Sequence, residues 1–395
     1  MACLAEPYCL PPDVAQSILL QQTILAPNDQ DQRQRHEKYL NALLFYAIEA
    51  VIALAVTGLC YAKSLHFGCL HIRIGMSDSA HDIGWATKPK DDPSVLALRE
   101  HLIANNGIKG LDVVSPSDIE QAVTLFRRDG FVVVADVLNN EQTEFLAHGC
   151  DQAIAEIIAL DNDYGGNRGT HRYSFGGSSL TRSQLHRPEW QMLLDIPVVH
   201  RLVAAIFGSE DYSLRAASGD FCLPGAVYYQ PLHSDIRDFV DAKQTPFSAF
   251  IDPTNAMSIR DLPCPYVCVN FLPQELTPLN GPTRQIPGTQ NARQAIPSLK
   301  EEPEWMRLST VCPAPAGGIL LRDVRAWHGG TPNLSDATRS IPNLEFYAPW
   351  FREPMVPGIS YKDYKKLSDH AQKLARFCVA DSSDELITGA TLRAL

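Results

Sequence analysis

The sequence has 395 residues, with 34 basic and 45 acidic side chains and a formal net charge of −11. This length is enough for two average domains or for one large β-rich domain with additional helices. The acidic balance and the lack of a dense Lys/Arg cluster argue against a nucleic-acid partner, because binding phosphates requires a basic surface. The ten cysteines lack the paired spacing of a zinc site, so we expect reduced thiols in a cytoplasmic protein.

One apolar segment near the N-terminus, residues 39–62, is long enough to cross a bilayer. It contains Glu49, and a carboxylate that faces lipid is costly. Three interpretations of residues 1–75 remain open: a dispensable extension or doubtful gene-model sequence, a membrane anchor through 39–62, or a helix that packs on the domain that follows. Since Met76 begins a stretch typical of a soluble N-terminus, we expect the functional domain to cover residues 76–395.

Three helices and a strand are predicted in the first part of this domain. Apolar periodicity and turn residues place these elements at 93–107, 115–130, 131–137 and 139–160, of which 131–137 is the strand. Ser115 and Pro116 are expected to begin the second helix, and Gly130 to end it. The segment "HRYSFGG", residues 171–177, combines aromatic side chains with glycines and could form part of a loop that faces a substrate.

From about residue 215 the pattern changes to short apolar runs separated by proline and glycine. These runs are "GAVYY" at 225–229, "YVCVNF" at 266–271, "GGILLRDV" at 317–324 and "NLEFYAPW" at 343–350. Such runs are typical of an antiparallel barrel or jelly roll. An amphipathic helix over 360–378 is expected to close the chain by packing on the domain. The sequence has no phosphate-binding loop, dinucleotide fingerprint or nucleophile elbow, so acyl and phosphoryl transfer lack their usual support.

Two potential metal ligands stand two positions apart in the strand-like segment "YYQPLHSDIRDF", residues 228–239. On a strand, His233 and Asp235 would point to the same side. His328 follows a predicted strand and precedes a Gly-Gly turn. Two imidazoles and one carboxylate can bind iron(II) on one face and leave three positions open for oxygen chemistry. Arg339, eleven residues further on, leads into the next strand and could hold a carboxylate in its planar guanidinium.

With these motifs, the chain resembles the phytanoyl-CoA dioxygenase family of iron(II)- and 2-oxoglutarate-dependent oxygenases from about residue 115 to 350. The stretches that carry the resemblance are "LFRRDGFVVVADVLNNEQ" at 125–142, "QPLHSD" at 230–235, "LNGPTRQIPGTQ" at 279–290 and "RDVRAWHGGTPNLSDATRS" at 322–340. The resemblance implies a mainly β protein with flanking helices and a double-stranded β-helix core, also described as a jelly roll or cupin-like fold. It further implies Fe(II) as the metal, 2-oxoglutarate as co-substrate and O2 as oxidant.

The resemblance also implies roles for six residues. His233, Asp235 and His328 would bind iron, and Arg339 would pair with the distal carboxylate of 2-oxoglutarate. Gln230 would contact the other carboxylate, and Thr283 is a weaker candidate for the same contact.

The chain also departs from the family pattern. The family often ends the third motif in Gly-Ser-His, whereas this chain has "PGTQ", so no role is assigned to Thr289 or Gln290. The intact carboxylate of Asp235 favours hydroxylation over halogenation, because related halogenases lack it.

The expected reaction is hydroxylation of a small organic or lipophilic molecule, of the secondary-metabolite or acyl type, with release of succinate and CO2. Desaturation or rearrangement could use the same residues. A zinc-dependent hydrolase or isomerase could also use the three metal ligands, but it would not need Arg339. A non-catalytic metal-binding scaffold would tolerate the loss of any ligand, yet all are present. The sequence carries no indication of the substrate's identity or of the oligomeric state.

Overall fold

The computed structural model describes residues 85, 88–236, 254 and 256–392, so the extension 1–75 and its apolar segment 39–62 lie outside the described residues. In the described part of the chain, no helix combines the length and the apolar character that a membrane span requires. The helices are α3 (Pro93–Asn105), α4 (Ile119–Asp129), α5 (Asn140–Ile158), α6 (Pro188–Leu193), α7 (Pro197–Phe207), α8 (Glu304–Leu308), α9 (Tyr361–Tyr364) and α10 (Asp369–Ala375). The six-residue β5 (Tyr266–Phe271) coincides with the predicted strand "YVCVNF".

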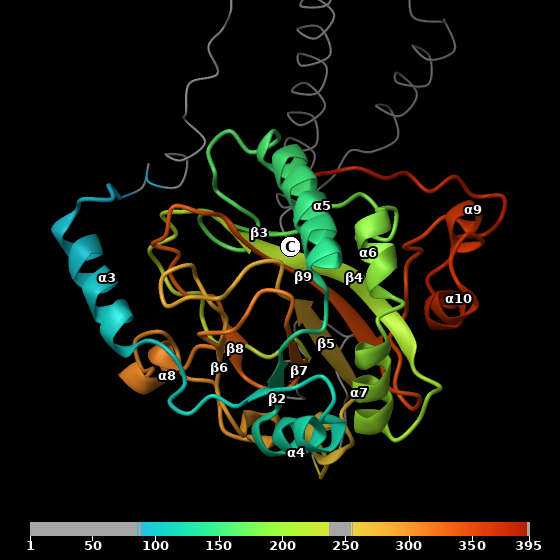
Figure 1. Cartoon of the computed structure of the whole chain (residues 1–395), viewed down its shortest axis with the longest axis horizontal. Helices are drawn as coiled ribbons and strands as arrows, with labels where there is room; N and C mark the ends of the chain where they lie inside the picture. The colour runs from blue at the N-terminus through green and yellow to red at the C-terminus, as the bar shows by residue number, and fades with distance from the viewer. Residues whose placement is uncertain (1–84, 86–87, 237–253, 255, 393–395) are drawn as a thin grey trace, which may run out of the picture. The chain divides into compact units, whose positions relative to one another are not determined.

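A seven-stranded sheet with the order β1-β2-β7-β5-β9-β4-β3 dominates the structure (Figure 1). Its other strands are β1 (Val113–Val114), β2 (Phe131–Val134), β3 (Arg172–Ser174), β4 (Ser213–Cys222), β7 (Ile319–Asp323) and β9 (Arg339–Tyr347). Every neighbouring pair in it is antiparallel except β1 with β2. A two-stranded sheet pairs β6 (Arg284–Gln285) with β8 (His328–Gly329). The predicted mainly β architecture with flanking helices is confirmed.

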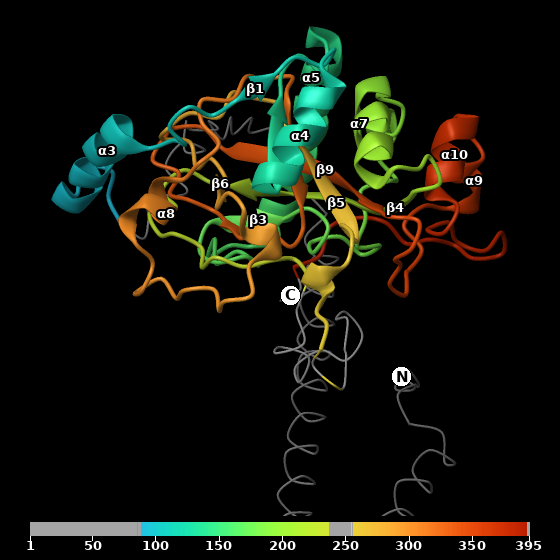
Figure 2. The same ribbon diagram turned by 90° about the horizontal axis from the view of Figure 1, so that it is seen from below.

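The two faces of the large sheet differ in chemistry because side chains alternate along each strand. On β9, Leu344 and Phe346 belong to the main apolar core, which also contains residues of α4, α5, α6 and α7. Of these helices, α4, α5 and α7 lie on one side of the sheet (Figure 2). The intervening β9 residues Asn343 and Glu345 line a cavity on the other face. The alternation thus separates an apolar face, which packs on the helices, from a polar face, which lines the cavity.

The first helix of the family-like region begins later than predicted. Ser115 and Pro116 lie outside α4, which starts at Ile119 and is capped by Asp118, whose Oδ1 accepts a bond from the Gln121 N–H at 3.2 Å. An aspartate side chain satisfies a free N–H of the first turn as a serine would. Gly130 ends the helix as predicted, in the left-handed region with φ 82°.

Three other sequence-based predictions are wrong: one strand is shorter, one is absent and one helix is divided. The strand predicted over 131–137 ends at Val134. "GAVYY" at 225–229 forms no strand, and only Ala226 makes a bridge, to Asn333. The closing helix over 360–378 is interrupted, because Ser368 caps a new helix, α10, by accepting a bond from the Ala371 N–H at 3.0 Å.

Candidate metal centre and co-substrate site

The two histidines are brought together by their backbones. The His233 N–H donates to the His328 carbonyl at 3.0 Å, and the His328 N–H donates to the His233 carbonyl at 2.9 Å. His233 is joined to His328 by this single bridge and belongs to no strand. The strand predicted around His233 is therefore not formed in the described residues up to 236. The pairing nevertheless places the two rings beside each other, with centroids 4.3 Å apart.

Each ring is oriented by a bond from its Nδ1 atom. His233 Nδ1 lies 3.1 Å from the Pro231 carbonyl oxygen, and His328 Nδ1 lies 3.0 Å from that of Ala326. A carbonyl oxygen can only accept, so Nδ1 carries the proton and Nε2 keeps a free lone pair. Backbone bonds of this kind commonly fix metal-binding histidines.

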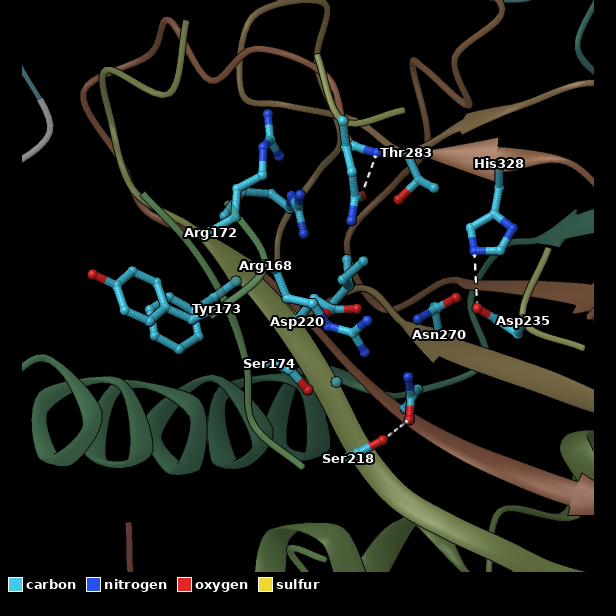
Figure 3. A pocket seen from close by; sticks show the side chains of 18 of the residues that line it. Arg168, Arg172, Tyr173, Ser174, Ser218, Asp220, Asp235, Asn270, Thr283 and His328 are labelled. Atoms are coloured by element: carbon cyan, nitrogen blue, oxygen red, sulfur yellow. Dashed lines mark hydrogen bonds and ion pairs between the residues drawn. The ribbon is translucent and has the colours of Figure 1, made fainter. Parts of the chain in front are cut away.

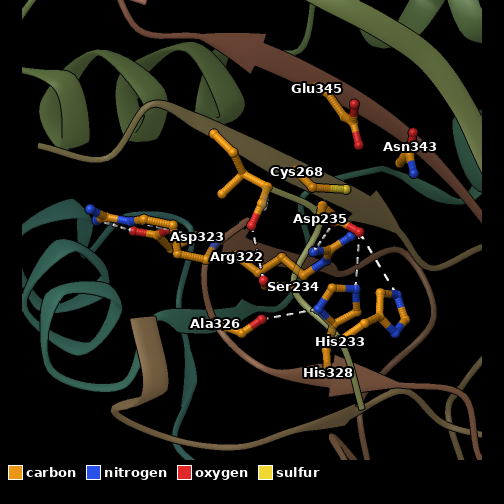
Figure 4. A network of polar contacts seen from close by, with 12 residues as sticks. His233, Ser234, Asp235, Cys268, Arg322, Asp323, Ala326, His328, Asn343 and Glu345 are labelled. Atoms are coloured by element: carbon orange, nitrogen blue, oxygen red, sulfur yellow. Dashed lines mark hydrogen bonds and ion pairs between the residues drawn. The ribbon is translucent and has the colours of Figure 1, made fainter. Parts of the chain in front are cut away.

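The Nε2 atoms converge on one carboxylate oxygen. Asp235 Oδ1 lies 3.8 Å from His233 Nε2 and 3.4 Å from His328 Nε2 (Figure 4). One ligand atom from each of these three residues lies within 4.8 Å of the others, and among the described residues this is the one cluster of three with metal-binding geometry. Two nitrogens and an oxygen on one side of a small space fit an iron-binding site.

The charges of the cluster suit a divalent cation. Desolvation raises the pKa of Asp235, but Arg322 and the two histidines outweigh it and hold the pKa well below its usual range. Desolvation and the neighbouring His328 lower the pKa of His233 to about 4. At neutral pH the carboxylate is therefore ionised and the His233 imidazole is neutral, which are the forms that bind metals.

Arg339 lies in the same cavity as the three potential ligands. It begins β9, opposite Cys222 on β4, and its Nε donates to the Gly281 carbonyl at 2.9 Å. Its Nη1 has no hydrogen-bond partner although the residue is 3 % exposed. Burial and the nearby Arg172 lower the pKa of the Arg339 guanidinium. A buried cation with an unsatisfied donor indicates a place for an anionic ligand.

Gln230 and Thr283, the other two predicted site residues, also line this cavity. Figure 3 shows Thr283 near His328 and Arg172. Gln230 Oε1 accepts a bond from the Gly330 N–H at 3.0 Å, so the Gly-Gly turn after His328 holds this side chain. A Cβ at position 330 would lie 2.6 Å from Arg172 Nη1, so a side chain there would displace the Arg172 guanidinium. The structure thus brings all six sequence-predicted site residues to one cavity.

Arg172 is a cavity residue that the sequence did not reveal as part of the site. It begins β3, in the segment predicted as a substrate-facing loop, and its Nη2 donates to the Tyr228 carbonyl at 3.0 Å and to the Thr331 carbonyl. The aromatic residues and glycines around Arg172 indicated a loop. No local sequence pattern predicts that this arginine is buried. Its charge adds to that of Arg339 on one side of the cavity.

The divergent residues Thr289 and Gln290 have structural roles. Thr289 Oγ1 donates to the Ile286 carbonyl at 2.6 Å and accepts from the Trp327 N–H at 2.8 Å. Gln290 Nε2 donates to the Arg127 carbonyl at 3.0 Å, at the end of α4. The Thr289 side chain therefore supports the segment before His328, and the Gln290 side chain supports the end of α4.

The structure is a mainly β protein whose cavity holds three potential metal ligands and a buried arginine with an open donor. The phytanoyl-CoA dioxygenase (PhyH) family profile matches residues 126–341, which is more than half of the chain, and the chain belongs to that family. It is therefore a 2-oxoglutarate-dependent enzyme, and its His-Asp-His group fits the iron site that this chemistry requires.

Several solved structures are similar to parts of the chain. AviO1 from Streptomyces viridochromogenes Tue57 is 19% identical with a TM-score of 0.42, and the match covers 60% of this chain and 98% of that one. The epimerase SnoN from nogalamycin biosynthesis, in complex with Fe3+, alpha ketoglutarate and nogalamycin RO, is 18% identical with a TM-score of 0.41 and coverages of 59% and 84%. EvdMO1 is 20% identical with a TM-score of 0.42, and the match covers 58% of this chain and 50% of that one.

Proposed function

We propose that this enzyme hydroxylates a small organic substrate, with iron(II) bound by His233, Asp235 and His328, and releases succinate and CO2. The observation that carries the proposal is that three convergent ligand atoms and an arginine with an open donor line one cavity. Either feature alone could serve another purpose, but together they match a metal with a chelating dicarboxylate.

The three ligands define what the metal could do. Iron(II) held by two imidazoles and one carboxylate would keep three positions for a 2-oxo acid and O2, and it would activate O2 for oxidation of a substrate C–H bond. The protein's part is to hold His233 and His328 by their backbone bridge and to present both Nε2 atoms to one side. An intact Asp235 fills the position that a halide would take and so favours hydroxylation over halogenation.

Arg339 would hold the distal carboxylate of 2-oxoglutarate. Its free Nη1 offers a charge-assisted hydrogen bond, worth about 1.5–3 kcal/mol in a buried setting. Arg172 contributes a second positive charge to the same cavity. Gln230 and Thr283 line the cavity too and would contact the carboxylate and ketone end.

The rival functions explain fewer of these features. A zinc hydrolase or isomerase has no use for a buried arginine with an open donor, and a scaffold has no use for a complete ligand set. Desaturation and rearrangement would use the same residues, with the outcome decided by how the substrate sits. The polar side chains of Ser218, Asn270 and Asn343 line the cavity and are available to orient a substrate.

The test combines turnover with a search for the substrate. Anaerobically purified full-length protein is supplied with Fe(II), 2-oxoglutarate and O2, and succinate is measured by mass spectrometry. Small-molecule extracts from cells with and without the intact gene are then compared for a mass difference of one oxygen or two hydrogens. One added oxygen supports hydroxylation, and a loss of two hydrogens supports desaturation. Tightly bound zinc with no succinate formed after iron loading would contradict the proposal.

A further inference from the structure

Arg322 lies on the cavity face of β7, beside the proposed metal ligand Asp235. It pairs in register with Cys268 on β5, and Cys268 pairs with Glu345 on β9, so these three side chains form one row across the sheet. The Arg322 residue is 6 % exposed and lines the same cavity as the two histidines. Its position is therefore fixed by three strands and not by a mobile surface.

The guanidinium of Arg322 holds one oxygen of Asp235. Arg322 Nη1 donates to Asp235 Oδ2 at 2.6 Å, while Oδ1 faces the Nε2 atoms of both histidines (Figure 4). Arg322 Nε also lies 3.4 Å from Asn270 Oδ1, which restrains the guanidinium from a second side. The carboxylate is thus divided, with one oxygen toward the metal position and the other occupied by an arginine.

This division matters for the number of open metal positions. A carboxylate that used both oxygens would occupy four positions together with two imidazoles, and an octahedral ion would then keep only two. A chelating 2-oxo acid and O2 need three. We propose that Arg322 is a positioning residue that makes Asp235 a one-oxygen ligand and so keeps the third position open. This inference rests on the proposed function.

A nearby arginine shows what a purely structural ion pair looks like in this segment. Arg325 Nη2 lies 2.7 Å from Asp323 Oδ2, and its Nη1 donates to the Ile259 and Leu262 carbonyls at 3.1 and 2.7 Å. The Arg325 residue is 5 % exposed and Arg322 is 6 % exposed, but the described hydrogen bonds and ion pairs of the Arg325 guanidinium go to Asp323, Ile259 and Leu262 and not to the three metal ligands. Arg325→Met is therefore the matched control for Arg322→Met, since both remove a buried, paired guanidinium and keep a long side chain.

The experiment is an anaerobic Mn(II) titration of full-length protein, followed by electron paramagnetic resonance with and without 2-oxoglutarate. Arg322→Met is expected to bind Mn(II) about ten- to a hundredfold more weakly than wild type, because loss of a residue that orients a ligand has effects of that size. Its Mn(II) spectrum should also change less when 2-oxoglutarate is added. Arg322→Lys, which keeps the charge, should restore much of the affinity, and Arg325→Met should bind as wild type does.

The possible outcomes separate this inference from the proposed function. If Arg322→Met binds Mn(II) and responds to 2-oxoglutarate as wild type does, Arg322 is a structural residue and the inference is overturned. The same holds if Arg325→Met is affected equally. If Arg322→Met does not fold, Arg322→Gln decides, with a loss of about tenfold expected and unchanged affinity overturning the inference. A wild-type protein that binds no Mn(II) would overturn the proposed function and this inference with it.

Discussion

Two buried arginines, Arg322 and Arg339, line one cavity in opposite electrostatic situations. Burial tends to lower the pKa of both. For Arg322 the carboxylate of Asp235 outweighs burial and raises the pKa, whereas for Arg339 the neighbouring Arg172 adds to burial and the pKa falls. Arg322 Nη1 is bonded to Asp235 at 2.6 Å, and Arg339 Nη1 has no partner.

The difference indicates that the charge of Arg322 is used within the fold, whereas the charge of Arg339 is open to a ligand. An arginine paired within the fold contributes to a defined structure, and the carboxylate it holds gains a fixed direction. An unpaired buried donor costs stability, and an anion bound at Arg339 would satisfy the Nη1 donor. The following experiments test the metal ligands of this cavity, then the two arginines, and finally a histidine pair outside the cavity.

The largest effect should come from the ligands that lie in the same cavity as the two arginines. His328→Ala removes one of two imidazoles, so Mn(II) affinity should fall by about a hundredfold or more and succinate formation should be lost with it. Anaerobic metal titration and a succinate assay measure the two losses. His200→Ala removes a histidine outside the cavity and serves as the control. Normal turnover in His328→Ala would show that the metal ligands are misassigned.

Arg339→Met should weaken 2-oxoglutarate binding by about ten- to a hundredfold, the equivalent of one charge-assisted hydrogen bond. Mn(II) affinity measured without 2-oxoglutarate should stay within about threefold of wild type, since Arg339 does not touch the ligands. Calorimetry on the Mn(II)-loaded protein gives both constants. Unchanged co-substrate affinity would mean that Arg172 or another cation does this work.

The same two arginines should affect stability in opposite directions when no ligand is present. Arg322→Met should lower the free energy of unfolding by about 1–3 kcal/mol, because it leaves Asp235 without its partner. Arg339→Met should leave it unchanged or raise it by about 1–2 kcal/mol, because it removes an unsatisfied buried charge. Urea unfolding at neutral pH compares the variants. A large destabilisation in Arg339→Met would show that its guanidinium is needed by the fold.

The smallest effect concerns a histidine pair outside the cavity. His200 Nδ1 lies 3.0 Å from His370 Nε2 and 2.9 Å from the Tyr212 hydroxyl, and burial, then His370, lowers the pKa of His200 to about 4. The unfolded chain therefore binds this proton more tightly, and stability should fall as pH drops from about 6.5 toward 4. Between pH 7 and 5 the expected loss is about 1–2 kcal/mol.

His200→Gln is the test of that assignment. The glutamine variant cannot take up the proton, so its unfolding free energy should depend less on pH over this range. Urea midpoints at pH 7, 6 and 5 provide the comparison with wild type. An identical pH dependence in both proteins would assign the loss to other groups.

Sequence motifs and the family resemblance predicted the architecture and six site residues, and the structure places all six in one cavity. Short apolar runs separated by proline and glycine, such as 266–271 and 343–350, predict strands, and the order of His233, Asp235 and His328 indicates a metal site. The start of a helix is hard to predict where several neighbouring residues could cap it. Asp118 caps α4 in place of Ser115, since both side chains can accept from a first-turn N–H.

Two further arginines that line the cavity, Arg322 and Arg172, show what sequence alone could not predict. Arg322 lies in the motif "RDVRAW" beside Arg325, and nothing local tells which of the two reaches Asp235 and which turns to Asp323. The choice depends on the register of β7 against β5, which is a tertiary property. Arg172 is likewise buried by the pairing of β3 with β4 and not by its own neighbours.

The most direct test of the central assignment is a crystal structure of the protein prepared anaerobically with Fe(II) and 2-oxoglutarate, with anomalous data at the iron edge. The account predicts a single strong iron peak bonded to His233 Nε2, His328 Nε2 and only one oxygen of Asp235. It also predicts the distal carboxylate of 2-oxoglutarate on the Arg339 guanidinium. Iron bound elsewhere, or 2-oxoglutarate bound without contact to Arg339, would contradict it.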